Sequence, residues 1–187
     1  MSEPIRSFIA VDVTAKAVIE AVSRLQRELL STGADLKPVE LHNLHLTLIF
    51  LGEQPKRTLD EVAKKLEQLN FRRFEVEFRG VGAFPNSSSP RVIWVDVGRG
   101  RRELVDLAHA VRELVRDIAR EDEEFTPHLT IARVKGPRNK EKLAEMIGRH
   151  SSDVFGAVEV SEVKLKRSIL TPRGPIYSDL YVKRLSA

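Results

Sequence analysis

The chain has 187 residues, carries a formal net charge of +4 and contains no cysteine. A chain of this length can form one compact domain with a hydrophobic core of its own, and the lack of cysteine excludes disulfides, a thiolate metal site and a Cys nucleophile. The positive charge favours a polyanionic partner such as nucleic acid.

The first half of the chain alternates between strand and helix patterns. The opening segment has charges at Glu3 and Arg6 before a short apolar run, which is typical of neither a signal peptide nor a membrane span. An apolar stripe at helical spacing ends before Gly33, and Thr58 with Glu61 is typical of a capping box. The predicted elements are a strand at 7–13, a helix at 15–30, a strand at 44–51, a helix beginning at Thr58 and a strand at 74–84.

The second half repeats this order of patterns. His109 falls on the polar face of a long helix, and His42 and His150 fall at the edges of elements, so we expect these three side chains to be solvated. The predicted elements are a strand at 91–97, a helix at 101–120, a strand at 128–134, a helix at 139–147, and strands near 154–170 and 176–185.

Short sequence matches relate the two halves at a nearly constant offset. AVDV at 10–13 resembles WVDV at 94–97, and PKR at 55–57 resembles PRN at 137–139. These collinear matches predict an internal repeat, approximately 5–84 and 90–185, within a single domain spanning 1–187. We therefore expect an α+β fold with two pseudo-symmetric lobes, each built from a strand, helix, strand, helix, strand unit, and a binding site between them.

The tetrapeptides HLTL at 45–48 and HLTI at 128–131 fall at matching places in this repeat. Residues i and i+2 of a strand face the same side, so His45 and Thr47 project together, as do His128 and Thr130. A Thr hydroxyl can donate a hydrogen bond to a phosphate oxygen, and an imidazole can exchange a proton near neutral pH. Each strand therefore offers one acid or base and one phosphate ligand.

Two such strands suit displacement at phosphorus, in which the nucleophile and the leaving oxygen occupy opposite apices. One histidine would take a proton at one apex and the other would give a proton at the opposite apex, while the two threonines hold equatorial oxygens. No metal or cofactor is required for this chemistry. The two half-sites look equivalent in sequence, so the residues alone leave the acid and the base unassigned.

Other interpretations of the motifs are weaker. Both histidines could be buried strand residues that bond to backbone carbonyls, but their symmetric places in a repeat argue against this. A zinc site lacks a third His or acidic ligand at a suitable spacing. A serine hydrolase would need a GxSxG motif, which the chain does not contain.

The paired motifs resemble the HxTx signatures of the two-histidine phosphoesterases, and specifically those of the RNA 2′,3′-cyclic phosphodiesterases, also called 2′-5′ RNA ligases. The segments IRSFIAVDV, HLTLIFLGE and LKRSILTPRGPIYSDL are similar to that family as well, so the resemblance covers essentially the whole chain. It implies antiparallel sheets that line a central groove. It also implies metal-independent hydrolysis of a terminal RNA 2′,3′-cyclic phosphate to a 2′-phosphomonoester.

In the scheme that this resemblance implies, His45 is the proton donor to the departing 3′ oxygen and His128 is the proton acceptor from water. Thr47 and Thr130 would bind the phosphate. A 5′-hydroxyl of another RNA could replace water, which would give reversible 2′-5′ ligation without ATP. The implied partner is RNA with a cyclic phosphate end, such as a tRNA fragment, and we expect a cytoplasmic monomer that makes no membrane contact.

Several basic side chains are secondary candidates. The resemblance suggests that Arg133 reaches the phosphate, although strict strand alternation would turn it away from the groove unless the strand has a bulge. The loop that follows carries Lys135, Arg138 and Lys140, which could either guide an RNA backbone or be solvated.

Two aromatic residues and two further functions remain as alternatives. Phe8 and Tyr177 could stack on a terminal base, but we favour a core position for each. The same chemistry could act on a small cyclic nucleotide, an ADP-ribose cyclic phosphate or a 2′-5′ oligoadenylate. The chain could also be a non-catalytic RNA-binding module, although intact His and Thr at both motifs argue against it.

Overall fold

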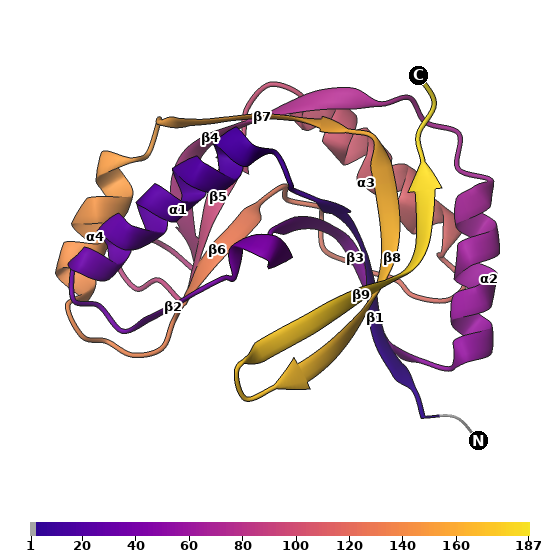
Figure 1. Cartoon of the computed structure of the whole chain (residues 1–187), viewed down its shortest axis with the longest axis horizontal. Helices are drawn as coiled ribbons and strands as arrows, with labels where there is room; N and C mark the ends of the chain where they lie inside the picture. Colours follow the sequence, from indigo (N-terminus) through magenta and orange to yellow (C-terminus); the bar gives the residue numbers. More distant parts are fainter. Residues whose placement is uncertain (1–2) are drawn as a thin grey trace.

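The computed structural model describes residues 3–187 and contains two antiparallel β-sheets with α-helices on their outer sides (Figure 1). In chain order the elements are β1 (Ile5–Asp12), α1 (Lys16–Ser31), β2 (Leu36–Pro38), the short 3-10 helix η1 (Leu41–Asn43), β3 (His45–Gln54), α2 (Lys56–Glu67), β4 (Phe74–Phe84), β5 (Val92–Val97), α3 (Arg101–Leu114), β6 (Leu129–Val134), α4 (Lys140–Arg149), β7 (Val154–Val160), β8 (Glu162–Thr171) and β9 (Gly174–Arg184).

Each sheet combines strands from both expected repeats. One sheet has the strand order β3-β1-β8-β9, and the other has the order β2-β6-β5-β4-β7. β4 comes from the first half of the chain but pairs with β5 and β7, whereas β8 comes from the second half and pairs with β1. The predicted α+β class with two antiparallel sheets is confirmed, while the duplication itself stays a prediction.

Two helices cover the outer side of each sheet, as Figure 1 shows. α1 and α4 pack on the sheet that contains β6, and α2 and α3 pack on the sheet that contains β3. α1 buries the stripe that its helical spacing predicts, and it stops where Gly33 takes up a left-handed conformation with φ of 79°. Within residues 3–187, no helix is both long enough and apolar enough to cross a membrane.

β3 and β6 each contain a β-bulge one residue after the threonine of the HLT motif. The pairing of β1 with β3 skips Leu48, and the pairing of β5 with β6 skips Ile131. Two successive side chains are therefore buried at each bulge, Leu48 with Ile49 and Ile131 with Ala132. The bulge shifts the alternation of side chains by one residue in the segment that follows, which in β3 lasts until a second bulge at Leu51.

Two helix boundaries differ from the expected ones. α2 begins at Lys56, with Pro55 at its cap position and no side-chain cap, so the predicted capping box is wrong. Thr58 lies inside the first turn, because its N–H donates to the carbonyl of Pro55. α3 ends at Leu114, and the apolar spacing that suggested a helix up to residue 120 continues through hydrogen-bonded turns.

The expected strand at 154–170 is in fact two strands that belong to different sheets. β7 and β8 are separated at Ser161, where the sequence has neither Gly nor Pro to mark the crossing. The short β2 and η1, which precede His45, carry no clear pattern and were not predicted. The hairpin of β8 and β9 extends away from the body of the molecule (Figure 1).

Candidate active site

The two HLT strands bring their polar side chains to one groove, which is lined by both sheets. His45 and Thr47 line it from β3, and His128, just before β6, and Thr130, in β6, line it from the other sheet, all four being partly exposed. The groove encloses about 1220 Å³. The structure therefore gathers into one cavity the four side chains that the sequence singles out.

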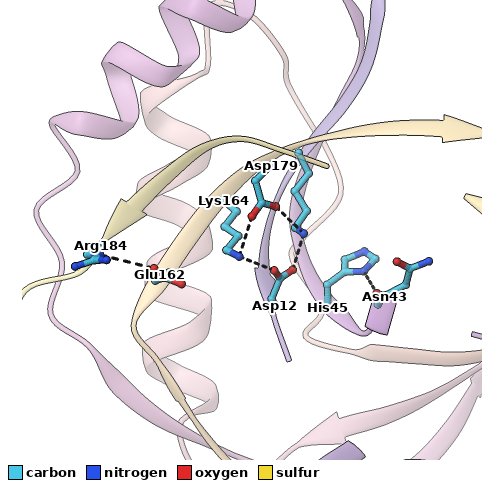
Figure 2. Close-up of polar contacts among 8 residues, drawn as sticks. Asp12, Asn43, His45, Glu162, Lys164, Asp179 and Arg184 are labelled. Carbon is cyan, nitrogen blue, oxygen red and sulfur yellow. Dashed lines mark hydrogen bonds and ion pairs between the residues drawn. The ribbon is translucent and has the colours of Figure 1, made fainter. Parts of the chain in front are cut away.

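Both imidazoles are held in the same tautomer by the backbone. The Nδ1 of His45 lies 2.7 Å from the carbonyl oxygen of Asn43 (Figure 2), and the Nδ1 of His128 lies 2.7 Å from the carbonyl oxygen of Thr126. A carbonyl oxygen can only accept, so Nδ1 carries a hydrogen and donates it in each case. The Nε2 atom of each ring is thereby left to accept or to give a proton.

The bulges bring one further position of each strand into the groove. Arg133 lines the groove, because the bulge at Ile131 corrects the alternation that would otherwise turn its side chain away. The matching position of β3 holds Phe50, which is 59% exposed and lines the same groove. One strand thus offers a guanidinium fork that suits phosphate oxygens, and the other offers an aromatic ring.

Each bulge is held from behind by a helix side chain. The amide of buried Gln26, in α1, donates to the carbonyls of Ile131 at 3.0 Å and Val39 at 2.9 Å. Arg112, in α3, donates through Nε to the carbonyl of Leu48 at 3.0 Å. Sequence reasoning missed both residues, although a glutamine within the apolar stripe of a helix is a signal that could have found Gln26.

Aromatic rings flank both histidines. Tyr177 meets the ring of His45 edge-on, with 5.3 Å between ring centroids, and Phe84 meets His128 in the same way at 5.2 Å. Phe8 is buried beside His45, as predicted, but it also forms part of the groove lining. Tyr177 lines the groove as well and is only partly buried, so its predicted core position is wrong.

The ring of Phe84 packs against the indole of Trp94, and Trp94 fits there because residue 82 is a glycine. The rings of Phe84 and Trp94 lie 5.1 Å apart between centroids. A Cβ at Gly82 would collide with the six-membered ring of Trp94. On the other strand pair, the position that matches Trp94 is Ala10. The aromatic wall beside His128 is therefore built differently from the one beside His45.

A four-residue ion-pair cluster lies next to His45 (Figure 2). Asp12 and Asp179 each contact both Lys164 and Lys166, at distances of 2.9 to 3.0 Å. Burial lowers the pKa of His45 below its usual value, and the carboxylate of Asp12 is among the groups that oppose this lowering. The neutral imidazole of His45 is therefore favoured in the free protein at neutral pH.

The basic loop after β6 contributes less to the groove than its charge suggested. Lys135 lines the groove. Arg138 donates to the carbonyl of Gly33 at 2.8 Å, and Lys140 begins α4, so neither belongs to the groove lining. Of the three expected RNA guides, only Lys135 is placed for that role.

The remaining histidines lie outside the groove lining. His42 and His109 are exposed, as predicted. The prediction for His150 is wrong, because its ring contacts Glu28 at 2.8 Å and Asp153 at 2.6 Å. Among residues 3–187, no three His, Asp or Glu side chains form a group that could hold a metal ion.

Two RNA 2′,3′-cyclic phosphodiesterases resemble this chain over nearly its full length. An RNA 2′,3′-cyclic phosphodiesterase of Archaeoglobus fulgidus is 44% identical over 178 residues, which are 95% of this chain and 98% of that protein. A protein of the same name from Methanothermobacter thermautotrophicus is 43% identical over 185 residues, covering 97% of this chain and 99% of its own length.

Solved structures share the fold. The crystal structure of TT0787 of Thermus thermophilus superposes with a TM-score of 0.78 at 32% identity, covering 96% of this chain and 97% of that one. Escherichia coli LigT complexed with phosphate superposes with a TM-score of 0.77 at 25% identity, covering both chains completely. The model of the 2′-5′ RNA ligase superfamily matches residues 12–168. The chain, with its paired HLT strands facing one groove, therefore belongs to the 2′-5′ RNA ligase superfamily.

Proposed function

We propose that this protein is an RNA 2′,3′-cyclic phosphodiesterase, which hydrolyses the cyclic phosphate at an RNA end to a 2′-phosphomonoester. The observation that carries the proposal is the pair of Nε2 atoms that His45 and His128 present to one groove, each beside a threonine. The names of the relatives in Archaeoglobus fulgidus and Methanothermobacter thermautotrophicus support the substrate. The groove also exceeds the roughly 300–1,000 Å³ of common small-molecule pockets, which favours RNA over a mononucleotide.

In the proposed reaction, the oxygen of a water molecule attacks phosphorus and the bond from phosphorus to the 3′ oxygen breaks. The Nε2 atom of neutral His128 accepts the proton of the water, and protonated His45 gives its proton to the departing 3′ oxygen. Thr47 and Thr130 donate to phosphate oxygens, and Arg133 offsets the charge that these oxygens carry. The products are a 2′-phosphate and a free 3′-hydroxyl.

The same groups can run a ligation, because the 5′-hydroxyl of another RNA can take the place of water. Its proton would pass to His128, and the product would be a 2′-5′ phosphodiester. No metal enters either scheme, so we expect activity to survive EDTA. We place the protein in the cytoplasm as a monomer acting on RNA such as tRNA fragments, and we treat residues 1–187 as one domain with an internal repeat.

The test is to incubate the protein with an RNA that ends in a 2′,3′-cyclic phosphate, with and without EDTA, and to identify the product. We expect a 2′-phosphate in both reactions. A 3′-phosphate, or no product from any cyclic-phosphate RNA, would contradict the proposal, and the second result would favour the alternative of a non-catalytic RNA-binding module.

A further inference from the structure

The groove has two ends of opposite charge, and the two HLT strands run between them in opposite directions. β3 starts at one end, where Asn43 precedes His45 and donates from its amide to the carbonyl of Pro175 in the β8–β9 hairpin. β3 reaches the other end at Phe50, whose N–H donates to Glu121 at 3.1 Å. The segment that leads into β6 lines the groove from Glu121 to Thr126, and the contact of Glu121 with Phe50 puts this segment at the second end.

The end next to His45 is basic. Lys37 of β2 pairs with Arg133 of β6, and its ammonium lies close to Gly174 in the hairpin. Lys135 and Arg173 line the same groove. The one acidic side chain of the groove lining here, Glu40, lies 3.2 Å from the ring of His42. Four cations therefore gather where β6 ends and the hairpin turns.

The end next to His128 is acidic. The run Glu121, Asp122, Glu123, Glu124 lines the groove, and all four residues are exposed. Arg112 pairs with Glu121 at 2.8 Å and donates to the backbone carbonyl of Glu123 at 3.0 Å. The same arginine holds the bulge of β3, so the acidic loop is fixed to the catalytic strand and is not a loose surface segment.

These ends fit the two partners of the proposed reaction. In the scheme above, the 3′ oxygen leaves on the His45 side, and the ribose to which it belongs carries the rest of the RNA. The RNA body would then lie over the cations, which stabilise its phosphates. The nucleophile must approach from the opposite apex, on the His128 side, next to the acidic run.

We propose that the acidic run at 121–124 makes the groove select water over the 5′-hydroxyl of a second RNA, so that hydrolysis prevails over ligation. This inference rests on the proposed function. A water molecule carries no charge and meets no barrier at the acidic end. An RNA acceptor brings a row of phosphates close to this run, in which three carboxylates have no ion-pair partner among residues 3–187, and like charges repel. Hydrolysis and ligation differ only in the nucleophile, because the phosphorus atom, the leaving 3′ oxygen and the proton transfers are the same in both reactions.

The test neutralises the three carboxylates that have no ion-pair partner among residues 3–187, with the triple variant Asp122→Asn, Glu123→Gln, Glu124→Gln. Initial rates of ligation and hydrolysis are measured together on one cyclic-phosphate RNA with a 5′-hydroxyl RNA acceptor. We expect the ratio of ligation to hydrolysis to rise about three- to tenfold at low salt. The gain should shrink at 1 M salt, where the Debye length falls to about 3 Å.

A matched control variant makes the same change of charge elsewhere. Glu61→Gln, Asp106→Asn and Glu141→Gln alter three exposed acids outside the groove lining, and we expect the ratio of this variant to stay at the wild-type value. A second control replaces the RNA acceptor with methanol. The ratio of methanolysis to hydrolysis should be the same in wild type and loop variant, since methanol is uncharged.

Two results would overturn the inference while leaving the proposed function intact. The first is an unchanged ligation ratio in a loop variant that still hydrolyses the cyclic phosphate. The second is an equal rise in the control variant, which would indicate an effect of net charge alone. A wild-type protein that hydrolyses no cyclic phosphate would instead contradict the proposed function.

Discussion

The His45 and His128 half-sites share a backbone design and differ in their surroundings. Both have a histidine whose Nδ1 donates to the carbonyl two residues earlier, and both have a bulge just past the threonine. Yet His45 lies next to an ion-pair cluster and the basic end of the groove, whereas His128 follows an acidic run. The shared part explains how two imidazoles face one groove, and the different parts make the two half-sites electrostatically unequal.

The largest expected loss of activity comes from removing either of the two groove imidazoles, His45 or His128. His45→Ala and His128→Ala should each lower kcat/KM on a cyclic-phosphate RNA about 100- to 10,000-fold, the range for a lost general acid or base. His42→Ala, at an exposed histidine outside the groove lining, is the matched control and should retain wild-type turnover. Near-wild-type turnover in either groove variant would disprove the acid and base pairing.

The next prediction compares two residues at matching positions of the HLT strands, Arg133 in β6 and Phe50 in β3. Arg133→Gln should reduce kcat/KM about tenfold or more, because it removes a charge-assisted contact to phosphate oxygens. Phe50→Leu should have a much smaller effect, since no charge is lost. Steady-state kinetics on the same RNA measure both. Equal losses in the two variants would indicate that the half-sites bind the phosphate symmetrically.

The helix side chains behind the bulges should matter for stability. Gln26→Met keeps the length of the side chain but removes the donor to the Ile131 and Val39 carbonyls. Because these groups are buried, we expect the free energy of unfolding to fall by about 1–3 kcal/mol, as measured by urea denaturation. Unchanged stability would mean that the carbonyls find other partners.

The smallest predicted effect is a shift in the pH profile. As a proton donor His45 must be protonated, and burial lowers its pKa, so kcat/KM should fall as the pH rises through a value below 6.5. Asp12→Asn removes a negative charge that favours the protonated imidazole, so this alkaline limb should move to still lower pH. Asp96→Asn, at the matching position in the other half, should leave it in place, because Asp96 pairs with Arg101. A shift toward higher pH in the Asp12 variant would contradict the assignment.

The sequence was informative about the strands that carry the site and much less so about what supports them. The HLT strands, their shared groove and the α+β class could be predicted, because period-two patterns and a doubled motif are local signals. The exchange of β4 and β8 between the sheets could not, since sheet pairing between distant segments leaves no local trace. The bulge at Leu48 was equally hidden in a continuous apolar run.

In the proposed mechanism the His45 side protonates the leaving 3′ oxygen and the His128 side activates the nucleophile. This division of roles is tested most directly with a cyclic-phosphate RNA in which sulfur replaces the bridging 3′ oxygen, because a thiolate leaves without needing a proton. We predict that this substrate restores much of the activity lost in His45→Ala and little of that lost in His128→Ala. Rescue of His128→Ala instead would contradict the assignment of the two half-sites.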